Sequence, residues 1–145
     1  MSESRSVARL KQLVFQRAKG CCEYCRSQVE FCPDPFSVEH IIPRILGGLF
    51  AWLNLALSCQ GCNNHKFTCI AAIDVVTGEM TRLFHPRQDR WSEHFAWNED
   101  GSLLVGLTPI GRVTIERLRL NRPGVVNLRR MLYANNQHPP ADPEP

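Results

Sequence analysis

The sequence predicts a small α+β protein that is held together by a metal site. Its 145 residues are 43% hydrophobic and 21% charged, which is typical of one globular domain with its own core. Apolar residues at helical spacing near the N-terminus are followed by short strand-like runs and then by further helical stretches. Four of the seven cysteines form two Cys-x-x-Cys pairs, at residues 22–25 and 59–62.

The two cysteine pairs have the spacing of zinc knuckles. Four thiolates satisfy a tetrahedral Zn²⁺ ion, and binding of that ion contributes about 10–16 kcal/mol to folding in small zinc domains. Buried apolar cysteines or a redox pair would not require two matched pairs. Cys32 and Cys69 lie outside the pairs and are expected to be packing residues. The predicted zinc ligands are Cys22, Cys25, Cys59 and Cys62.

The first half of the chain predicts a helix, two short strands and a second helix. Residues 6–19 place apolar side chains at helical spacing and stop before a glycine. Residues 36–42 are a strand candidate that ends at a proline, and residues 55–58 are a second candidate. A further helix is expected to begin near residue 63, just after the second cysteine pair, and to continue towards residue 73.

The second half predicts a hairpin followed by two helices. The turn dipeptide Asp100-Gly101 lies between two apolar runs, which is typical of a β-hairpin. Thr108 followed by Pro109 combines a helix N-cap with a proline at the first helical position, so a helix is expected from there to about residue 120. Residues 124–134 are expected to form the last helix.

The chain is therefore expected to divide into three parts. Residues 1–73 would form the zinc-stabilised core with its N-terminal helix, and residues 74–134 an α/β extension packed on that core. Residues 135–145 contain few apolar side chains and several prolines, a composition that predicts a disordered tail.

Cysteine usage and the N-terminus favour a cytoplasmic location. The number of cysteines is odd and their spacing is that of a metal site, which suits a reducing compartment. The N-terminal segment has no uninterrupted apolar run of the kind a secretory signal needs. Residues 45–65 contain no Lys, Arg, Asp or Glu, but glycines and asparagines interrupt them, so no membrane span is expected.

The net charge gives little attraction for a polyanion. The chain has 17 Lys and Arg against 14 Asp and Glu, a formal +3, so any nucleic-acid binding must come from local clusters. Six arginines and a single acidic residue occur between residues 112 and 130. This run is either a phosphate-contacting stripe, with Arg112 and Arg119 as candidates, or a solvated helix face.

Motifs between and after the cysteine pairs resemble the HNH endonuclease family. Residues 38–44 read Val-Glu-His-Ile-Ile-Pro-Arg, a Gly-Gly pair follows at residues 47–48, and Asn-Leu at residues 54–55. Residues 62–66 read Cys-Asn-Asn-His-Lys. The resemblance covers roughly residues 14–66 and implies the ββα-metal fold of that family. The later segments LFHPR, LTPIGR and LNRP resemble an extension seen in some bacterial members.

The resemblance also implies roles for individual residues. His40 would be the general base, Glu39 a ligand of a catalytic Mg²⁺ or Mn²⁺ ion, and Asn54 the asparagine that braces the site. Asn63 would be the second ion ligand in an HNN-type variant, with His65 as a competitor for that position. Because strand residues alternate between faces, Glu39 and His40 are expected at a strand end or bulge, where both can approach one phosphate.

The sequence thus predicts a metal-dependent endonuclease that hydrolyses phosphodiester bonds in DNA, most naturally a duplex. The alternatives are a non-catalytic zinc module that binds nucleic acid or protein, and an RNA-directed nuclease of the same fold. Arg44 and Lys66 are either phosphate contacts or solvated side chains. The apolar loop Leu49–Leu53 is expected to be core or an interface with a protein partner or a second copy, and less favourably a wedge against DNA.

Overall fold

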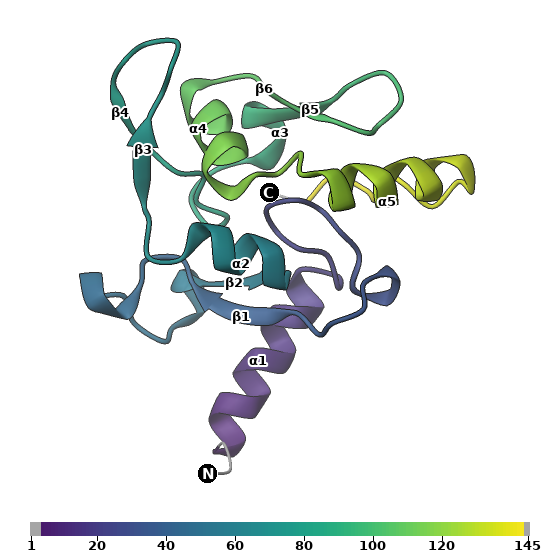
Figure 1. The fold of residues 1–145 in the computed structure, drawn as a ribbon. Coiled ribbons are helices and arrows are strands. Elements are labelled where there is room, and N and C mark those ends of the chain that lie inside the picture. Colours follow the sequence, from purple (N-terminus) through teal and green to yellow (C-terminus); the bar gives the residue numbers. More distant parts are fainter. Residues whose placement is uncertain (1–3, 144–145) are drawn as a thin grey trace.

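A computed structural model describes residues 4–143, and its first half forms a ββα unit (Figure 1). Strands β1 (Ser37–His40) and β2 (Leu55–Ser58) pair antiparallel, and helix α2 (Gln60–Lys66) follows directly. Helix α1 (Arg5–Arg17) lies on the face of the hairpin opposite α2 (Figure 1). The fold is therefore α+β with a cysteine cluster beside the hairpin, as the sequence predicts.

The two faces of the β1–β2 hairpin belong to different cores. In the continuous register, His40 is paired with Leu55, and Glu39 is paired with Ala56. Leu55 packs in a cluster with Val14 of α1, whereas Ala56 packs in the larger cluster that contains the cysteines. Since paired residues share a face, His40 is on the α1 side of the hairpin and Glu39 is on the α2 side.

Helix α2 begins and ends earlier than the sequence predicts. Cys59 is its N-cap, and the Cys59 Sγ atom accepts a hydrogen bond of 3.4 Å from the backbone N–H of Cys62. The helix stops at Phe67, whose φ of 51° is incompatible with a continuing helix. The expected helix up to residue 73 is wrong, because residues 71–73 instead form a strand.

That strand is β3 (Ala71–Ile73), and it pairs antiparallel with β4 (Met80–Arg82) around a turn at Gly78. This hairpin was not predicted from the sequence. Its strands have three residues each and carry no alternation long enough to recognise. The domain boundary expected after residue 73 would separate β3 from β4. The division of the chain into a core, an extension and a tail stays a prediction.

The connection between β1 and β2 requires a glycine at residue 48. The chain makes two 3₁₀ turns, Arg44–Leu46 and Trp52–Asn54. A Cβ atom on Gly48 would lie 1.7 Å from the carbonyl oxygen of Ile42, so no larger residue fits. Gly48 is therefore explained by a close approach of two backbone segments, and Gly47 by its φ of 90°.

The second half packs on the face of α2 away from the hairpin (Figure 1). Hairpin β5 (Phe95–Trp97) and β6 (Leu104–Gly106) forms as expected, preceded by the short helix α3 (Trp91–His94). Helix α4 (Pro109–Leu118) starts at the predicted Thr108 cap, whose Oγ1 accepts a 3.1 Å hydrogen bond from Gly111. Helix α5 (Pro123–Ala134) follows.

Residues 135–143 differ from the expected disordered tail. His138 is buried, its ring lies 4.6 Å from that of Trp97, and its Nε2 atom is 2.8 Å from the carbonyl oxygen of Gly101. Arg26 donates a 2.9 Å hydrogen bond to the carbonyl oxygen of Ala141. One aromatic contact and a few hydrogen bonds to backbone carbonyls thus anchor a segment of polar composition. The last two residues of the expected tail lie outside the described chain.

None of the helices between residues 4 and 143 combines the length and apolar character that crossing a bilayer requires.

Candidate zinc centre and nuclease site

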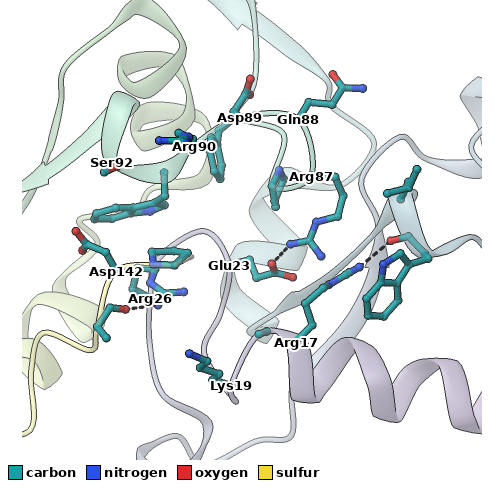
Figure 2. Close-up of a pocket in the computed structure, with 18 residues that line it drawn as sticks. Arg17, Lys19, Glu23, Arg26, Arg87, Gln88, Asp89, Arg90, Ser92 and Asp142 are labelled. Carbon is teal, nitrogen blue, oxygen red and sulfur yellow. Dashed lines mark hydrogen bonds and ion pairs between the residues drawn. The ribbon is translucent and has the colours of Figure 1, made fainter. Parts of the chain in front are cut away.

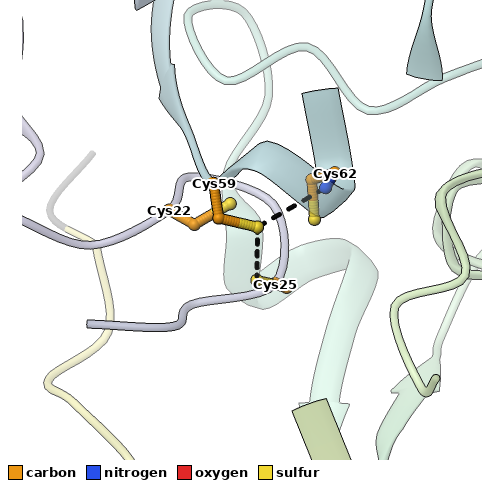
Figure 3. A group of neighbouring side chains, drawn as sticks. All are labelled: Cys22, Cys25, Cys59 and Cys62. Carbon is orange, nitrogen blue, oxygen red and sulfur yellow. Dashed lines mark hydrogen bonds between the residues drawn. The ribbon is translucent and has the colours of Figure 1, made fainter. Parts of the chain in front are cut away.

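The two cysteine pairs meet in a single buried cluster (Figure 3). The ligand atoms of Cys22, Cys25, Cys59 and Cys62 all lie within 4.8 Å of one another. All four residues are buried, and the Sγ atoms of Cys25 and Cys59 are 3.6 Å apart. Hydrogen bonds from the other three cysteines, Cys22 foremost, hold the pKa of Cys25 well below its ordinary value. The donor set and its closed, buried geometry fit a structural zinc ion.

Two arginines from the second half lie against this cluster. Arg122 donates to the Sγ atoms of Cys59 and Cys62 at 3.4 and 3.6 Å. Arg129 is 3% exposed and donates to the backbone carbonyl of Cys25 at 3.2 Å. Four thiolates around one divalent ion carry two net negative charges, and two guanidinium groups offset them.

The residues inside the first knuckle reach both strands of the hairpin. The hydroxyl of Tyr24, which is fully buried, donates a hydrogen bond to the carboxylate of Glu39 on β1. Glu23 accepts a 2.8 Å hydrogen bond from the backbone N–H of Leu57 on β2, and it also pairs with Arg87. The zinc knuckle therefore fixes the hairpin through side chains as well as through packing.

Glu39 is engaged inside the protein. It is 7% exposed, and its Oε2 atom lies 3.5 Å from the Lys66 ammonium. Lys66 is 1% exposed and also donates a 2.8 Å hydrogen bond to the carbonyl of Ile41. Burial raises the pKa of Glu39, although the Lys66 charge and the Tyr24 hydrogen bond act against that rise. Lys66, expected as a phosphate contact or a solvated side chain, is instead a buried partner of Glu39.

His40 lies in different surroundings, at the end of β1. Its Nε2 atom accepts a hydrogen bond of 3.3 Å from Nε of the exposed Arg44, and its ring is 5.8 Å from that of Phe50. Partial burial and the Arg44 charge both lower the pKa of His40. Both effects favour the neutral form of the imidazole. His40 occupies a strand end as expected, but the register turns it away from Glu39, so the two side chains do not face a common space.

Asn54 joins the start and the end of the β1–β2 connection. Its carboxamide exchanges two hydrogen bonds with the backbone of Ile42, at 2.9 and 3.0 Å, and donates a third to Leu49 at 2.9 Å. The backbone carbonyl of Asn54 accepts from Ile41 at 2.8 Å. These bonds hold the two residues that follow His40.

Asn63 lies on α2 one turn before Lys66, so the two side chains share a side of the helix. It is half-buried, and its carboxamide forms no hydrogen bond with any residue between 4 and 143. His65 is two residues further on and points elsewhere around the helix; burial and then Arg122 lower its pKa.

The remaining candidates are distributed over the surface. Arg112 forms a two-pronged ion pair with Asp74, with N–O distances of 3.1 and 2.8 Å. Arg119 is exposed and its side chain forms no hydrogen bond within the described chain. In the Leu49–Leu53 loop, Phe50 packs against the cluster that contains Val14, whereas Leu49 and Leu53 are each 72% exposed. The interface role of the loop stays a prediction.

Sequence reasoning missed Tyr24, Glu23, Arg122 and Arg129. The position of Glu23 and Tyr24 between two zinc ligands was a usable signal, because such residues are held rigidly and their side chains have fixed directions. Arg122 and Arg129 lie far from the cysteines in sequence, and nothing local indicates their contacts.

Comparison with known proteins agrees with the geometry. The chain contains a ββα unit with four thiolates at its side, an arrangement that fits a small zinc-stabilised domain. Residues 22–68 match the model of the HNH endonuclease family, which indicates a nuclease that acts on nucleic acid. That segment contains both cysteine pairs, the hairpin and α2. No curated protein and no solved structure matches the chain.

Proposed function

We propose that this protein is an endonuclease that hydrolyses phosphodiester bonds in DNA, with His40 as the general base. The observation that carries the proposal is a partly exposed imidazole at the end of the hairpin in the segment that matches the HNH family, in surroundings that favour its neutral form. A neutral imidazole can take a proton from the water that attacks phosphorus.

Arg44 and Asn54 support this role. Arg44 donates to the Nε2 lone pair of His40, and its exposed guanidinium can pair with a phosphate oxygen instead. That exchange would free Nε2 at the moment the substrate binds. Asn54 holds the backbone of residues 41 and 42, so we expect it to keep the imidazole at the strand end.

The residues expected to hold a catalytic Mg²⁺ or Mn²⁺ ion do not form a ready site. Glu39 is buried with Tyr24 and with the Lys66 ammonium, and a cation there would meet the charge of Lys66. Asn63 has an unused carboxamide on α2, but it offers one neutral oxygen only. A hard ion, when bound, would neutralise charge at phosphorus. Binding by Glu39 and Asn63 stays a prediction, and it requires Lys66 to leave Glu39.

The test is cleavage of supercoiled plasmid by the zinc-loaded protein, with and without added Mg²⁺ or Mn²⁺. We expect His40→Ala to lower the rate at least a hundredfold, which is the usual scale of a lost general base. We expect Asn54→Ala to lower it less. His65→Ala is the matched histidine control and should cut at the parental rate.

Retained zinc in each variant separates loss of chemistry from loss of fold. A His40→Ala variant that cuts as fast as the parent would remove His40 as the base. If the parent protein cuts neither plasmid, single strands nor RNA under any metal, the result favours the non-catalytic zinc module. Parallel cleavage of duplex DNA, single strands and RNA identifies the substrate, since the phosphate chemistry is shared among them.

A further inference from the structure

A pocket of about 570 Å³ lies on the α1 side of the first knuckle (Figure 2). The end of α1, the segment 84–92, residues 141–143 and the pair Trp52-Leu53 line it. Its volume is in the range of small-ligand sites, about 300–1,000 Å³. None of the lining residues belongs to the hydrolytic group described above.

Arginines outnumber acidic residues in the lining of the pocket. The lining arginines are Arg17, Arg26, Arg87 and Arg90. Glu23 is already used by Arg87 and by the backbone of Leu57, and Asp89 pairs with Arg82 at 2.6 Å. Asp142 is the third acidic residue of the lining, and it is exposed.

Unsatisfied hydrogen-bond donors point to the same place. Among residues 4–143, three buried side-chain nitrogen atoms have no hydrogen-bond partner: Nε of Arg17, Nη1 of Arg87 and Nε1 of Trp91. All three residues line this pocket. Trp91 is 5% exposed and the Arg87 side chain 11%, so water has little access to either. Buried donors without a partner are uncommon and unfavourable, so a shift of these side chains towards an oxygen-rich ligand in the pocket would satisfy them.

Arg17 and Arg87 are close enough to repel each other. Burial and then the Arg87 charge lower the pKa of Arg17 to about 10. The other donors of Arg17 are directed to the carbonyl oxygens of Trp52 and Leu55, at 2.9 and 2.6 Å, and its guanidinium stacks 3.7 Å from the centre of the Trp52 ring. Two neighbouring guanidinium groups match the oxygens of one phosphate.

We propose that this pocket binds the phosphate group of a nucleotide, with Arg17, Arg87 and Arg90 as the phosphate contacts. The Trp52 side chain is 40% exposed and offers a surface for the base. Arg17 donates a hydrogen bond to the carbonyl of Leu55, and Leu55 is the β2 residue paired with His40. A phosphate bound to Arg17 would therefore lie near the end of β2 that is paired with His40. Assigning that phosphate to the substrate strand rests on the proposed nuclease function.

Binding is measured on the full, zinc-loaded chain carrying His40→Ala, without added divalent metal. The probe is a trinucleotide labelled at its 3′ end and bearing a 5′-phosphate, followed by fluorescence polarisation and by quenching of tryptophan emission. AMP and inorganic phosphate serve as competitors. The test variants are Arg90→Gln, at an exposed side chain that leaves the fold unaffected, and Arg17→Lys, which keeps the charge but loses the planar fork. Arg130→Gln is the control, because Arg130 is exposed and lies outside the lining.

We expect Arg90→Gln and Arg17→Lys each to weaken binding at least fivefold, and Arg130→Gln to change it less than twofold. Competition by AMP alone assigns the pocket to free nucleotides, and tighter binding of the trinucleotide assigns it to a nucleic-acid strand. Equal weakening by all three variants, or no binding of any probe, would overturn the proposal. Plasmid cleavage is scored separately, so a protein that cuts but binds no probe here loses only the pocket.

Discussion

The two faces of the β1–β2 hairpin differ in how completely their polar groups are used. On the α2 face, the zinc thiolates, Tyr24, Glu39 and Lys66 are buried and partnered. On the α1 face, His40 at the strand end has one exposed arginine as its polar partner. The first arrangement is that of a rigid support and the second that of a group free to react. If His40 is the general base as proposed, stability and chemistry depend on opposite sides of the same four-residue strand.

The largest expected effect is loss of the zinc ligands. Cys62→Ser should abolish zinc binding and cooperative unfolding, because the ion contributes about 10–16 kcal/mol in comparable sites. Metal content and circular dichroism measure the outcome. Cys32→Ser is the control, since Cys32 lies outside the cluster. If Cys62→Ser keeps stoichiometric zinc, the four cysteines are not the zinc ligands, and the description of the α2 face as a metal-stabilised support is wrong.

Breaking the ion pair on the supporting face should come next. Lys66→Met leaves the buried Glu39 carboxylate without its cation, which costs about 3–5 kcal/mol in the free energy of unfolding. Adding Glu39→Gln to Lys66→Met should recover much of that loss. Urea denaturation measures both. Equal stability of the parent and Lys66→Met would mean that the pair does not support the hairpin.

The arginine beside the thiolates should have a smaller effect. Arg122→Gln removes two N–H···S hydrogen bonds, and we expect zinc affinity to fall about 10- to 100-fold. Competition with a chromophoric chelator gives the affinity. Arg119→Gln is matched in residue type and neighbourhood, but its side chain makes no hydrogen bond with a described residue, so its zinc affinity should stay parental. Equal losses of zinc affinity in both variants would indicate that positive charge near the site matters and that the N–H···S hydrogen bonds do not.

The smallest effect concerns the reactive face. Arg44 lowers the pKa of His40, so Arg44→Gln should raise that pKa towards its ordinary value. A general base acts in its neutral form, so activity declines as pH falls through the His40 pKa. The acidic limb of kcat/KM should therefore move to higher pH in the variant. An acidic limb that stays in place, with activity still dependent on His40, would show that Arg44 does not control this base.

The sequence predicted those features of the fold that depend on interactions between residues close together in the chain. The cysteine pairs, the Thr108-Pro109 helix start and the hairpin at Asp100-Gly101 all depend on neighbours within a few residues. The hairpin β3–β4 escaped, because strands of three residues carry too little alternation to be recognised. The anchored tail also escaped, since it depends on Trp97 and Gly101, which lie far away in the chain.

In the candidate nuclease site too, the sequence did not predict what depends on residues that are distant in the chain. The sequence identifies His40 and the asparagines by their motif, but the orientation of Glu39 depends on which strand face the zinc knuckle covers. Tyr24 and Lys66 decide that orientation from two separate elements. Only the folded chain brings them together.

The position of Arg122 and Arg129 has a consequence for how the protein is made. Both belong to the last quarter of the chain, whereas the cysteines they neutralise are synthesised much earlier. A nascent chain can complete the electrostatic shell of its thiolates only after α5 has emerged from the ribosome. Stable capture of the ion thus becomes a late step of maturation, and a prematurely terminated product would hold its zinc less tightly.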